Sequence, residues 1–199
     1  SSAMKIRKYA AIDIGSNAVR LLIKDVNVSD ANSIHQERIA YYRVPLRLGG
    51  DVFEKGKLSK SKAKDLVKVM IAFRHLIDVQ EVVACRAVAT SALRSAKNSD
   101  DIIDSVHRKS EIKIECLSGD EEANLIFQNF KNVGRKFNRD LLCIDVGGGS
   151  TELSVVRDNE RVALKSFRLG TVRMLKGTTP EGVWEHIREF VNRYRGAKP

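Results

Sequence analysis

The sequence predicts an α/β protein in which one lobe occurs twice. Stretches with the periodicity of strands alternate with stretches that have the periodicity of helices, which is the pattern of an α/β fold. In addition, a buried strand that ends in aspartate and a glycine turn occurs at residues 10–23 as AAIDIGSNAVRLLI and again at residues 141–156 as LLCIDVGGGSTELSVV. Because these stretches lie far apart, they indicate a duplicated lobe and not an array of short repeats.

The first copy is predicted to open with three antiparallel strands, because apolar runs are separated there by turn residues. These strands lie at residues 9–14, 18–26 and 33–42. Apolar residues then recur at helical spacing over residues 58–78, with Ser59 or Ser61 as the N-cap. The remaining elements are a strand at 81–89, a helix from Asn98 or Ser99 to about 106, a strand at 112–117 and a helix over 118–130 capped by Asp120.

The pattern restarts at residue 140. Strands are predicted at 140–147, 151–156 and 161–170, followed by a helix over about 180–194 with proline in its first turn. We therefore place a first lobe at residues 5–138 and a second at 139–199. The second copy has fewer elements than the first, so we expect it to be only the start of a lobe.

The formal net charge of +10 predicts an anionic partner, because a basic surface raises the local concentration of phosphate groups. A solvated, lysine-rich surface without a function is the alternative. With 6% aromatic residues and no zinc-finger, RNP-type or basic-zipper pattern, the sequence argues against a nucleic-acid partner.

The sequence has neither an apolar run of membrane-helix length nor a cysteine motif for zinc. No apolar run is long enough for a membrane helix or a signal peptide, so we expect a cytoplasmic protein with no membrane partner. The three cysteines, Cys85, Cys116 and Cys143, fit no zinc motif, and we expect them to be buried, reduced thiols.

Each strand that ends in aspartate is followed by a turn whose residues suit phosphate binding. Glycine accepts backbone conformations that expose several N–H groups on one side, and such a row of donors binds phosphate oxygens. A neighbouring aspartate can hold a divalent cation, and hard oxygen ligands suit Mg²⁺. The candidate residues are Asp13 with Gly15, Ser16 and Asn17 in the first copy, and Asp145 with Gly147, Gly148, Gly149 and Ser150 in the second. A single Asp-x-Gly is more often an ordinary hairpin turn, whereas two copies favour a phosphate held from both sides.

Four stretches together resemble a known family. AAIDIGSNAVRLLI, ATSALRSA, SGDEEANLIF and CIDVGGGSTELSVV are similar, in order, to the motif set of the exopolyphosphatase and guanosine pentaphosphate phosphohydrolase family. That family lies within the actin, sugar kinase and heat-shock chaperone ATPase superfamily. The resemblance implies ribonuclease-H-like lobes of the actin-like type, one complete and one partial. It also implies that Mg²⁺ or another divalent cation assists the removal of a terminal phosphate.

The resemblance further assigns roles to single residues. Glu122 would be the general base that deprotonates the attacking water, and Arg94 would bind the phosphate that is transferred. Asp145 and Glu152 would hold the metal, with Asp13 supporting the metal and phosphate region. From the residues alone, structural alternatives stay open. A glutamate in the first turn of a helix is favoured by the helix dipole, and Arg94 reads as a surface loop arginine.

The predicted function is hydrolysis of a terminal phosphoanhydride by in-line attack of water. The predicted partners are inorganic polyphosphate or guanosine penta- or tetraphosphate. Two alternatives are kept: a sensor that binds an alarmone or nucleotide without hydrolysing it, and a sugar-kinase-like ATPase. The sensor is kept because Asn124 stands where family members commonly have arginine, and because the second lobe is expected to be incomplete. A homodimer of the full-length protein is also left open.

Overall fold

The computed structural model describes residues 6–30, 33–132 and 139–196. Contacts within the chain divide it into two compact units, Ser1–Cys116 and Leu117–Pro199, and each is described by itself. Among the helices of the described ranges, none combines the length and the apolar character that crossing a membrane requires.

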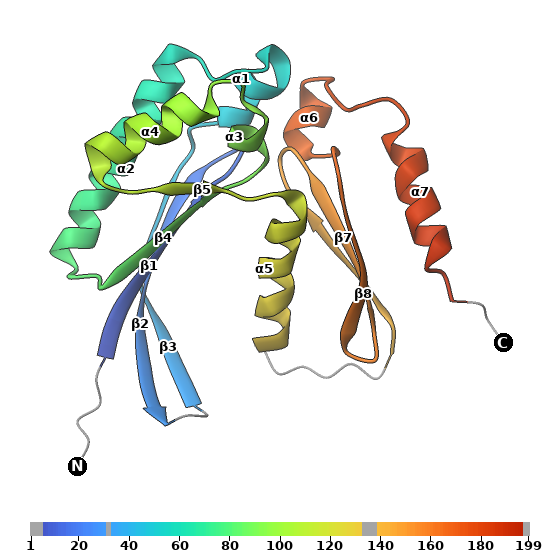
Figure 1. Cartoon of the computed structure of the whole chain (residues 1–199), viewed down its shortest axis with the longest axis horizontal. Helices are drawn as coiled ribbons and strands as arrows, with labels where there is room; N and C mark the ends of the chain where they lie inside the picture. The colour runs from blue at the N-terminus through green and yellow to red at the C-terminus, as the bar shows by residue number, and fades with distance from the viewer. Residues whose placement is uncertain (1–5, 31–32, 133–138, 197–199) are drawn as a thin grey trace. The chain divides into compact units, whose positions relative to one another are not determined.

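A mixed sheet forms the centre of the first unit (Figure 1). Its strands are β1 (Ile6–Ile14), β2 (Val19–Asp30), β3 (Ser33–Val44), β4 (Ala84–Ala89) and β5 (Ile114–Cys116), in the spatial order β3-β2-β1-β4-β5. The first three strands pair antiparallel, as the sequence predicts. Strand β4 pairs parallel with β1, and β5 pairs parallel with β4. The parallel pairs are possible because helices carry the chain back between these strands.

The helices of this unit confirm part of the prediction and correct part of it. They are α1 (Leu48–Lys55), α2 (Lys60–Val79), α3 (Ser91–Ser95) and α4 (Ser99–Ser110). Helix α2 and its cap are confirmed, since Lys62 N donates a hydrogen bond to the Ser59 hydroxyl at 3.3 Å. Asn98, one of the two predicted caps, is the N-cap residue of α4, but its side-chain amide bonds both backbone groups of Leu58, at 3.0 and 2.9 Å, and not the helix. The sequence does not predict α1 and α3, because helices this short leave little periodicity.

The core of the first unit lies on one face of its sheet. Ala10, Ile12 and Ile14 of β1 are buried, whereas Ala11 between the first two is exposed, so one face of the strand is covered. Helix α2 turns an apolar stripe inward, made of Leu66, Met70, Phe73 and Ile77. It also packs against α4, which lies beside it (Figure 1).

The second unit is built on an antiparallel meander. Its elements are the strands β6 (Leu141–Val146), β7 (Thr151–Arg157) and β8 (Glu160–Phe167) and the helices α5 (Gly119–Asn132), α6 (Thr171–Leu175) and α7 (Val183–Arg193). The predicted strands are confirmed. Helix α7 begins later than predicted, because Gly182 adopts a φ of 78° directly before it, and Pro180 lies ahead of that turn.

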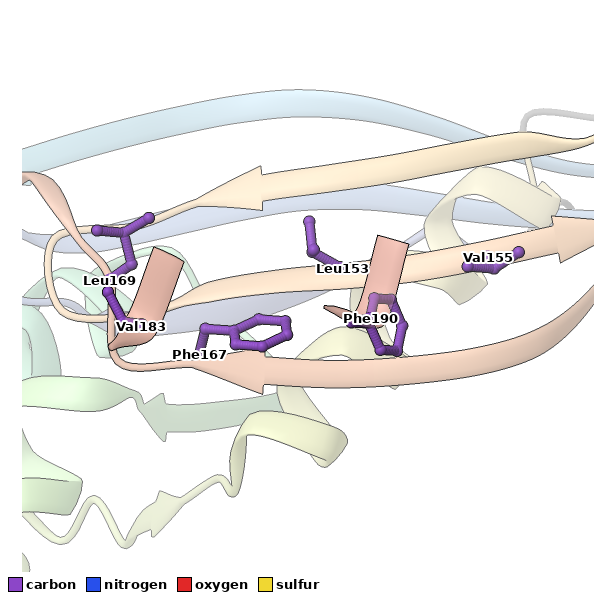
Figure 2. Close-up of a cluster of buried hydrophobic side chains, with 6 residues drawn as sticks. All are labelled: Leu153, Val155, Phe167, Leu169, Val183 and Phe190. Carbon is purple, nitrogen blue, oxygen red and sulfur yellow. The ribbon is translucent and has the colours of Figure 1, made fainter. Parts of the chain in front are cut away.

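A hydrophobic cluster joins α7 to one face of this sheet (Figure 2). Its buried members are Leu153, Val155, Phe167, Leu169, Val183 and Phe190. The rings of Phe167 and Phe190 meet edge to face, with 5.8 Å between centroids and an interplanar angle of 76°. Because side chains alternate along a strand, Glu152 and Ser154 of β7 project from the opposite face. That face is the one that α5 covers.

Helix α5 belongs to the second unit, although the sequence places it in the first lobe. It contacts β7 and β8, and the division between the units falls before Leu117. The predicted lobe boundary at residue 138 lies outside the described residues. The lobe bounds 5–138 and 139–199 stay a prediction, since chain order alone does not decide which sheet an amphipathic helix covers.

The cysteines are free thiols, and they are less buried than predicted. Cys116 is exposed, and Cys85 and Cys143 are half-buried. Cys116 is the last residue of β5, an edge strand, where cover is partial. Burial still raises the pKa of the Cys85 and Cys143 thiols above the ordinary value. Both thiols therefore stay protonated at neutral pH.

Candidate active site

The hairpin of β6 and β7 places two predicted metal ligands side by side. Asp145 of β6 pairs directly with Glu152 of β7, and residues 147–150 connect the two strands. A hydrogen bond from Gly147 N to Ser150 O, 2.8 Å long, closes the turn. Directly opposed residues of an antiparallel pair lie on the same face, so the two carboxylates project together.

The glycines of this turn direct their carbonyl groups toward the segment that begins α6. The donors are Thr171 N to Gly147 O at 3.0 Å, Val172 N to Gly148 O at 2.9 Å and Arg173 Nε to Gly149 O at 2.6 Å. These peptide bonds are trans, and in a trans peptide the C=O of one residue points opposite to the N–H of the next. The N–H groups of Gly148, Gly149 and Ser150 therefore point away from α6 as a row of donors. Gly147 and Gly148 are half-buried and the other two residues are buried.

Glu152 is a buried carboxylate whose position is set by two hydroxyl groups. Its side chain belongs to a residue only 2% exposed. Oε1 accepts hydrogen bonds from Ser150 Oγ at 2.8 Å and from Ser166 Oγ at 3.0 Å. Because these donors come from the glycine turn and from β8, the carboxylate is oriented from two sides.

The first turn of α5 brings Glu122 to the same place. Ser118 caps this helix, because Glu121 N donates to its hydroxyl at 3.1 Å and Ser118 N donates to Glu121 Oε2 at 2.8 Å. The sequence predicts Asp120 as the cap, and this prediction is wrong: the cap is Ser118. Gly119 sits so close to β8 that a Cβ there would lie 2.4 Å from Ser166 Cβ. The capping box and this close approach fix the backbone at the start of α5, and with it the position of the Glu122 Cα.

Together these elements form a cluster of three carboxylates. One oxygen from each of Glu122, Asp145 and Glu152 lies within 4.8 Å of the others. Like charges this close repel one another, and burial of Glu152 makes its charge costlier still. A divalent cation would remove both penalties, and carboxylate oxygens are ligands that Mg²⁺ prefers. The residues present therefore fit a bound Mg²⁺.

A pocket of about 420 Å³ adjoins this cluster. Asp145 and Glu152 line one part of it, and Ala123, Ile126 and Phe127 of α5 line another. Asp145 and Glu152 therefore face a space large enough for solvent or part of a ligand, and apolar residues form part of its wall.

The counterpart turn in the first unit has the same backbone but a different charge. Gly15 N donates to Ala18 O at 3.0 Å, as Gly147 N does to Ser150 O. Across the ladder from Asp13 stands Arg20, at the place that Glu152 has in the second copy, and the two form an ion pair. Burial by itself would lower the pKa of the Arg20 guanidinium, but the charge and hydrogen bond of Asp13 raise it. The first copy thus presents a neutral pair where the second presents two carboxylates.

The remaining candidates of the first unit gather around the same turn. Ser16 is buried, and its hydroxyl shares a hydrogen bond of 2.9 Å with Ser91 Oγ. Ser91 begins α3, the helix that carries Arg94, so the turn and this arginine are held to one another. Asn17, the last residue of the turn, is exposed. The structure therefore groups one set of candidates in each unit.

Comparison with known proteins identifies the family. The sequence model of the Ppx/GppA phosphatase family matches residues 27–197. The chain belongs to this family. The match includes Arg94, Glu122, Asp145 and Glu152, whereas Asp13 and its turn precede it.

Curated relatives carry two kinds of name. Exopolyphosphatase 1 of Mycobacterium tuberculosis is 29% identical over 175 residues, which cover 87% of this chain and 49% of that protein. The guanosine-5'-triphosphate,3'-diphosphate pyrophosphatase of Aliivibrio fischeri is 30% identical over 170 residues, which cover 85% of this chain and 33% of that protein. The chain thus spans half or less of the length of these Ppx/GppA relatives.

Solved structures of Ppx/GppA proteins confirm the predicted α/β fold class with its actin-like architecture. An exopolyphosphatase from Cytophaga hutchinsonii matches with a TM-score of 0.83 and 25% identity, covering 96% of this chain and 65% of that one. The Aquifex aeolicus member of the Ppx/GppA family matches with a TM-score of 0.73 and 26% identity, covering 95% and 61%.

The structure also shows the contacts of Asn124, which stands where the resemblance predicts arginine. Asn124 Oδ1 accepts a hydrogen bond from the guanidinium of Arg161 in β8. That guanidinium also lies over the Phe127 ring, 5.3 Å from its centroid. Residues two apart on a helix do not share a face, so Asn124 points away from Glu122. Asn124 therefore takes part in the contact of α5 with β8 and not in the carboxylate cluster.

Two residues that contact the Ppx/GppA motif residues escape inspection of the sequence, Ser166 and Arg173. Ser166 bonds Glu152, and Arg173 bonds Gly149. The contacts of Ser166 depend on strand pairing, which has no local signal. For Arg173 a signal exists: the tripeptide Arg-Leu-Gly follows the third strand in both copies, at 47–49 and 168–170, and marks the segments that hold the two turns.

Proposed function

We propose that this chain carries the metal-binding and phosphate-binding part of a hydrolase that releases terminal phosphate from inorganic polyphosphate or guanosine pentaphosphate. The observation that carries the proposal is the cluster of Glu122, Asp145 and Glu152 beside a turn with a row of amide donors. A terminal phosphoryl group carries several negative charges, so a cation and a row of N–H groups suit it. The names of the relatives support the same substrate class.

Each residue of the second unit then has a task. Asp145 and Glu152 would hold Mg²⁺ or another divalent cation, which when bound neutralises charge on the phosphate chain. The N–H groups of Gly148, Gly149 and Ser150 would donate hydrogen bonds to phosphoryl oxygens. Glu122 would take a proton from water as the water oxygen bonds to the terminal phosphorus. The bond from phosphorus to the bridging oxygen breaks in line, and the shortened chain leaves with its electron pair.

The first unit contributes fixed charge and a second turn. Arg94 is proposed to bind the phosphoryl group, because its guanidinium can oppose the charge that develops in transfer. The turn at 15–17 is proposed as a second phosphate contact. Asp13 is proposed to support this region, and it forms an ion pair with Arg20.

Glu122 is assigned as base although its oxygen lies near the metal ligands. Glu122 lies in the first turn of α5 and is half-buried, whereas Glu152 is buried and oriented by two hydroxyl groups. A general base needs access to water and to the bulk, and a ligand needs a fixed geometry. This contrast favours Glu122 as base and Glu152 as ligand.

The substrate class rests on charge as well. A net charge of +10 attracts polyanions, and both inorganic polyphosphate and guanosine pentaphosphate are polyanions. The proposal therefore includes both substrates and leaves the choice between them to direct comparison.

The test offers the chain polyphosphate, guanosine pentaphosphate and ATP side by side with Mg²⁺, and measures phosphate release. Release from either of the first two that stops on chelation supports the proposal. The Glu122→Gln variant should lose about 100-fold or more in the rate of phosphate release. It should keep its affinity for Mn²⁺, the divalent cation that serves as the probe for the Mg²⁺ site. Asp120→Asn, in the same turn of α5, is the control. Unchanged turnover in Glu122→Gln would show that another group is the base. Binding of guanosine pentaphosphate without release from any of the three would favour the sensor.

A further inference from the structure

The glycine turn at 147–150 is held in place by the segment 170–173, and the side chain of Arg173 is part of that hold. Thr171 and Val172 use backbone N–H groups to bond the carbonyls of Gly147 and Gly148. The third carbonyl, that of Gly149, is bonded by Arg173 Nε at 2.6 Å. Arg173 is 6% exposed, so its cation is buried against this carbonyl.

The segment 170–173 approaches the turn at 147–150 so closely that position 170 requires glycine. A Cβ there would lie 2.3 Å from Gly148 O and 2.5 Å from Gly149 N. The φ of Gly170 is −157°, which any residue adopts, so the requirement comes from proximity and not from backbone conformation. The segment and the turn are therefore packed backbone to backbone, and the position of one fixes the position of the other.

In the first copy, backbone donors bond the corresponding carbonyl groups of the turn. Gly49 N donates to Ser16 O at 2.9 Å, and Arg47 N donates to Asn17 O at 2.9 Å. Asn17 occupies the place of Gly149, counted from the aspartate that ends each strand. The guanidinium of Arg173 thus does in the second copy what a main-chain N–H does in the first. In the second copy, replacement of the Arg173 side chain therefore removes a donor to a turn carbonyl that the main chain supplies in the first copy.

We infer that Arg173 is a positioning residue for the phosphate-binding amides, and that it acts on substrate through the turn. Its Nε bonds the carbonyl side of the Gly149–Ser150 peptide, and the N–H of that peptide points the other way. Fixing the carbonyl therefore fixes the direction of the Ser150 N–H. A buried guanidinium costs free energy unless it is hydrogen-bonded, so its burial here indicates a defined role. The inference rests on the proposed function for the meaning of the amide row.

The alternative is that Arg173 binds phosphate directly through its charge, and substitution can separate the two roles. In Arg173→Gln the side-chain Nε2 is the same number of bonds from Cα as the arginine Nε, so a neutral donor remains for Gly149 O. In Arg173→Lys the charge remains, but the nitrogen lies one bond farther out. Arg173→Met keeps the length of the stem and has neither donor nor charge. Arg168→Met is the matched control, because Arg168 is an exposed arginine just before the segment 170–173.

The experiment measures two quantities on the full chain: the backbone amide resonances of Gly148, Gly149 and Ser150 without ligand, and the affinity for inorganic pyrophosphate with Mg²⁺. We expect Arg173→Met to shift all three resonances and to weaken binding about tenfold, the effect of losing one hydrogen bond from a charged group. Arg173→Gln should restore most of the affinity and Arg173→Lys less. Arg168→Met should leave both quantities as in the parent chain.

Two results would overturn the inference. One is restoration by lysine but not by glutamine, which would assign Arg173 to phosphate through its charge. The other is unchanged amide resonances in Arg173→Met. If Arg173→Met does not fold, the comparison of glutamine with lysine decides. The resonances need no ligand, so a parent chain that binds no pyrophosphate would refute the proposed function while the positioning role is still judged by the amides.

Discussion

Glu152 shows how much of the site depends on single hydrogen bonds. Its Oε1 accepts from Ser150 of the turn and from Ser166 of β8, so the carboxylate is fixed before any cation arrives. In the first copy the corresponding residue is Arg20, which neutralises Asp13. One residue type at one ladder position therefore separates a neutral pair in the first copy from a pair of carboxylates in the second. Groups that orient a metal ligand commonly affect affinity nearly as much as the ligand itself.

At this scale we expect Ser166→Ala to lower the affinity for Mn²⁺ by about tenfold or more, because the oriented carboxylate loses a donor. Glu152→Gln should lower it further. Ser154→Ala, which removes a hydroxyl from the face of β7 that carries Glu152, is the control. Titration of Mn²⁺ followed by calorimetry measures all three variants. An affinity in Ser166→Ala equal to that of Ser154→Ala would show that the hydroxyl does not orient Glu152.

Among the elements, the first turn of α5 has the largest effect on the site. The pattern Ser-x-x-Glu at 118–121 is a capping box, and it outweighs Asp120 as the cap. This signal is present in the sequence, but the choice between neighbouring cap residues needs the hydrogen bonds. Gly119 then lets the helix approach β8, which no local pattern reveals.

For this element we expect Gly119→Ala to destabilise the protein by about 1–3 kcal/mol, although alanine is the better helix former. The added Cβ would meet Ser166 Cβ and Oγ at 2.4 Å, so the start of α5 must move. Glu122 and the Ser166 hydroxyl would move with it, and Mn²⁺ affinity should fall as well. Gly196→Ala, where an added Cβ meets nothing within 4 Å, is the control. Urea unfolding and the Mn²⁺ titration together check the result. A variant as stable as the parent would contradict the close packing.

The whole molecule is a duplication whose two copies bury equivalent residues to different extents. Ile12 and Ile144 each precede the aspartate that ends a strand, yet Ile12 is 1% exposed and Ile144 is 60% exposed. Leu142 and Val146 on the same face of β6 are exposed too. Helix α7 covers this face over β7 and β8, where the cluster of Figure 2 lies. Equivalent strand residues of the two copies should therefore contribute differently to the free energy of unfolding.

This difference predicts the outcome of one paired substitution. Ile12→Ala should lower the free energy of unfolding by about 2–5 kcal/mol, because it empties a filled core position. Ile144→Ala should change it by less than about 0.5 kcal/mol, as surface substitutions do. Urea unfolding followed by circular dichroism compares the two. Similar losses in both variants would mean that the face of β6 is covered in solution.

How far the sequence predicts this protein follows from the range of the interactions. The strands β1, β2, β3, β6, β7 and β8, the helix α2 and both glycine turns follow from local periodicity and turn chemistry, and the structure confirms them. The short helices α1, α3 and α6 span too few residues to show a period. The cap at Ser118 and the role of Asn98 needed the choice between competing hydrogen bonds.

By itself the sequence determined the fold class, the duplicated strand and turn, and the residue types that suit metal and phosphate. Only the tertiary structure decided that α5 packs with the second unit, that Glu122 meets Asp145 and Glu152, and that Arg173 holds the glycine turn. The physical reason is that periodicity and caps arise from neighbours in the chain. The contacts of α5, Ser166 and Arg173 arise from strand pairing and close backbone approach, which join residues far apart in the sequence.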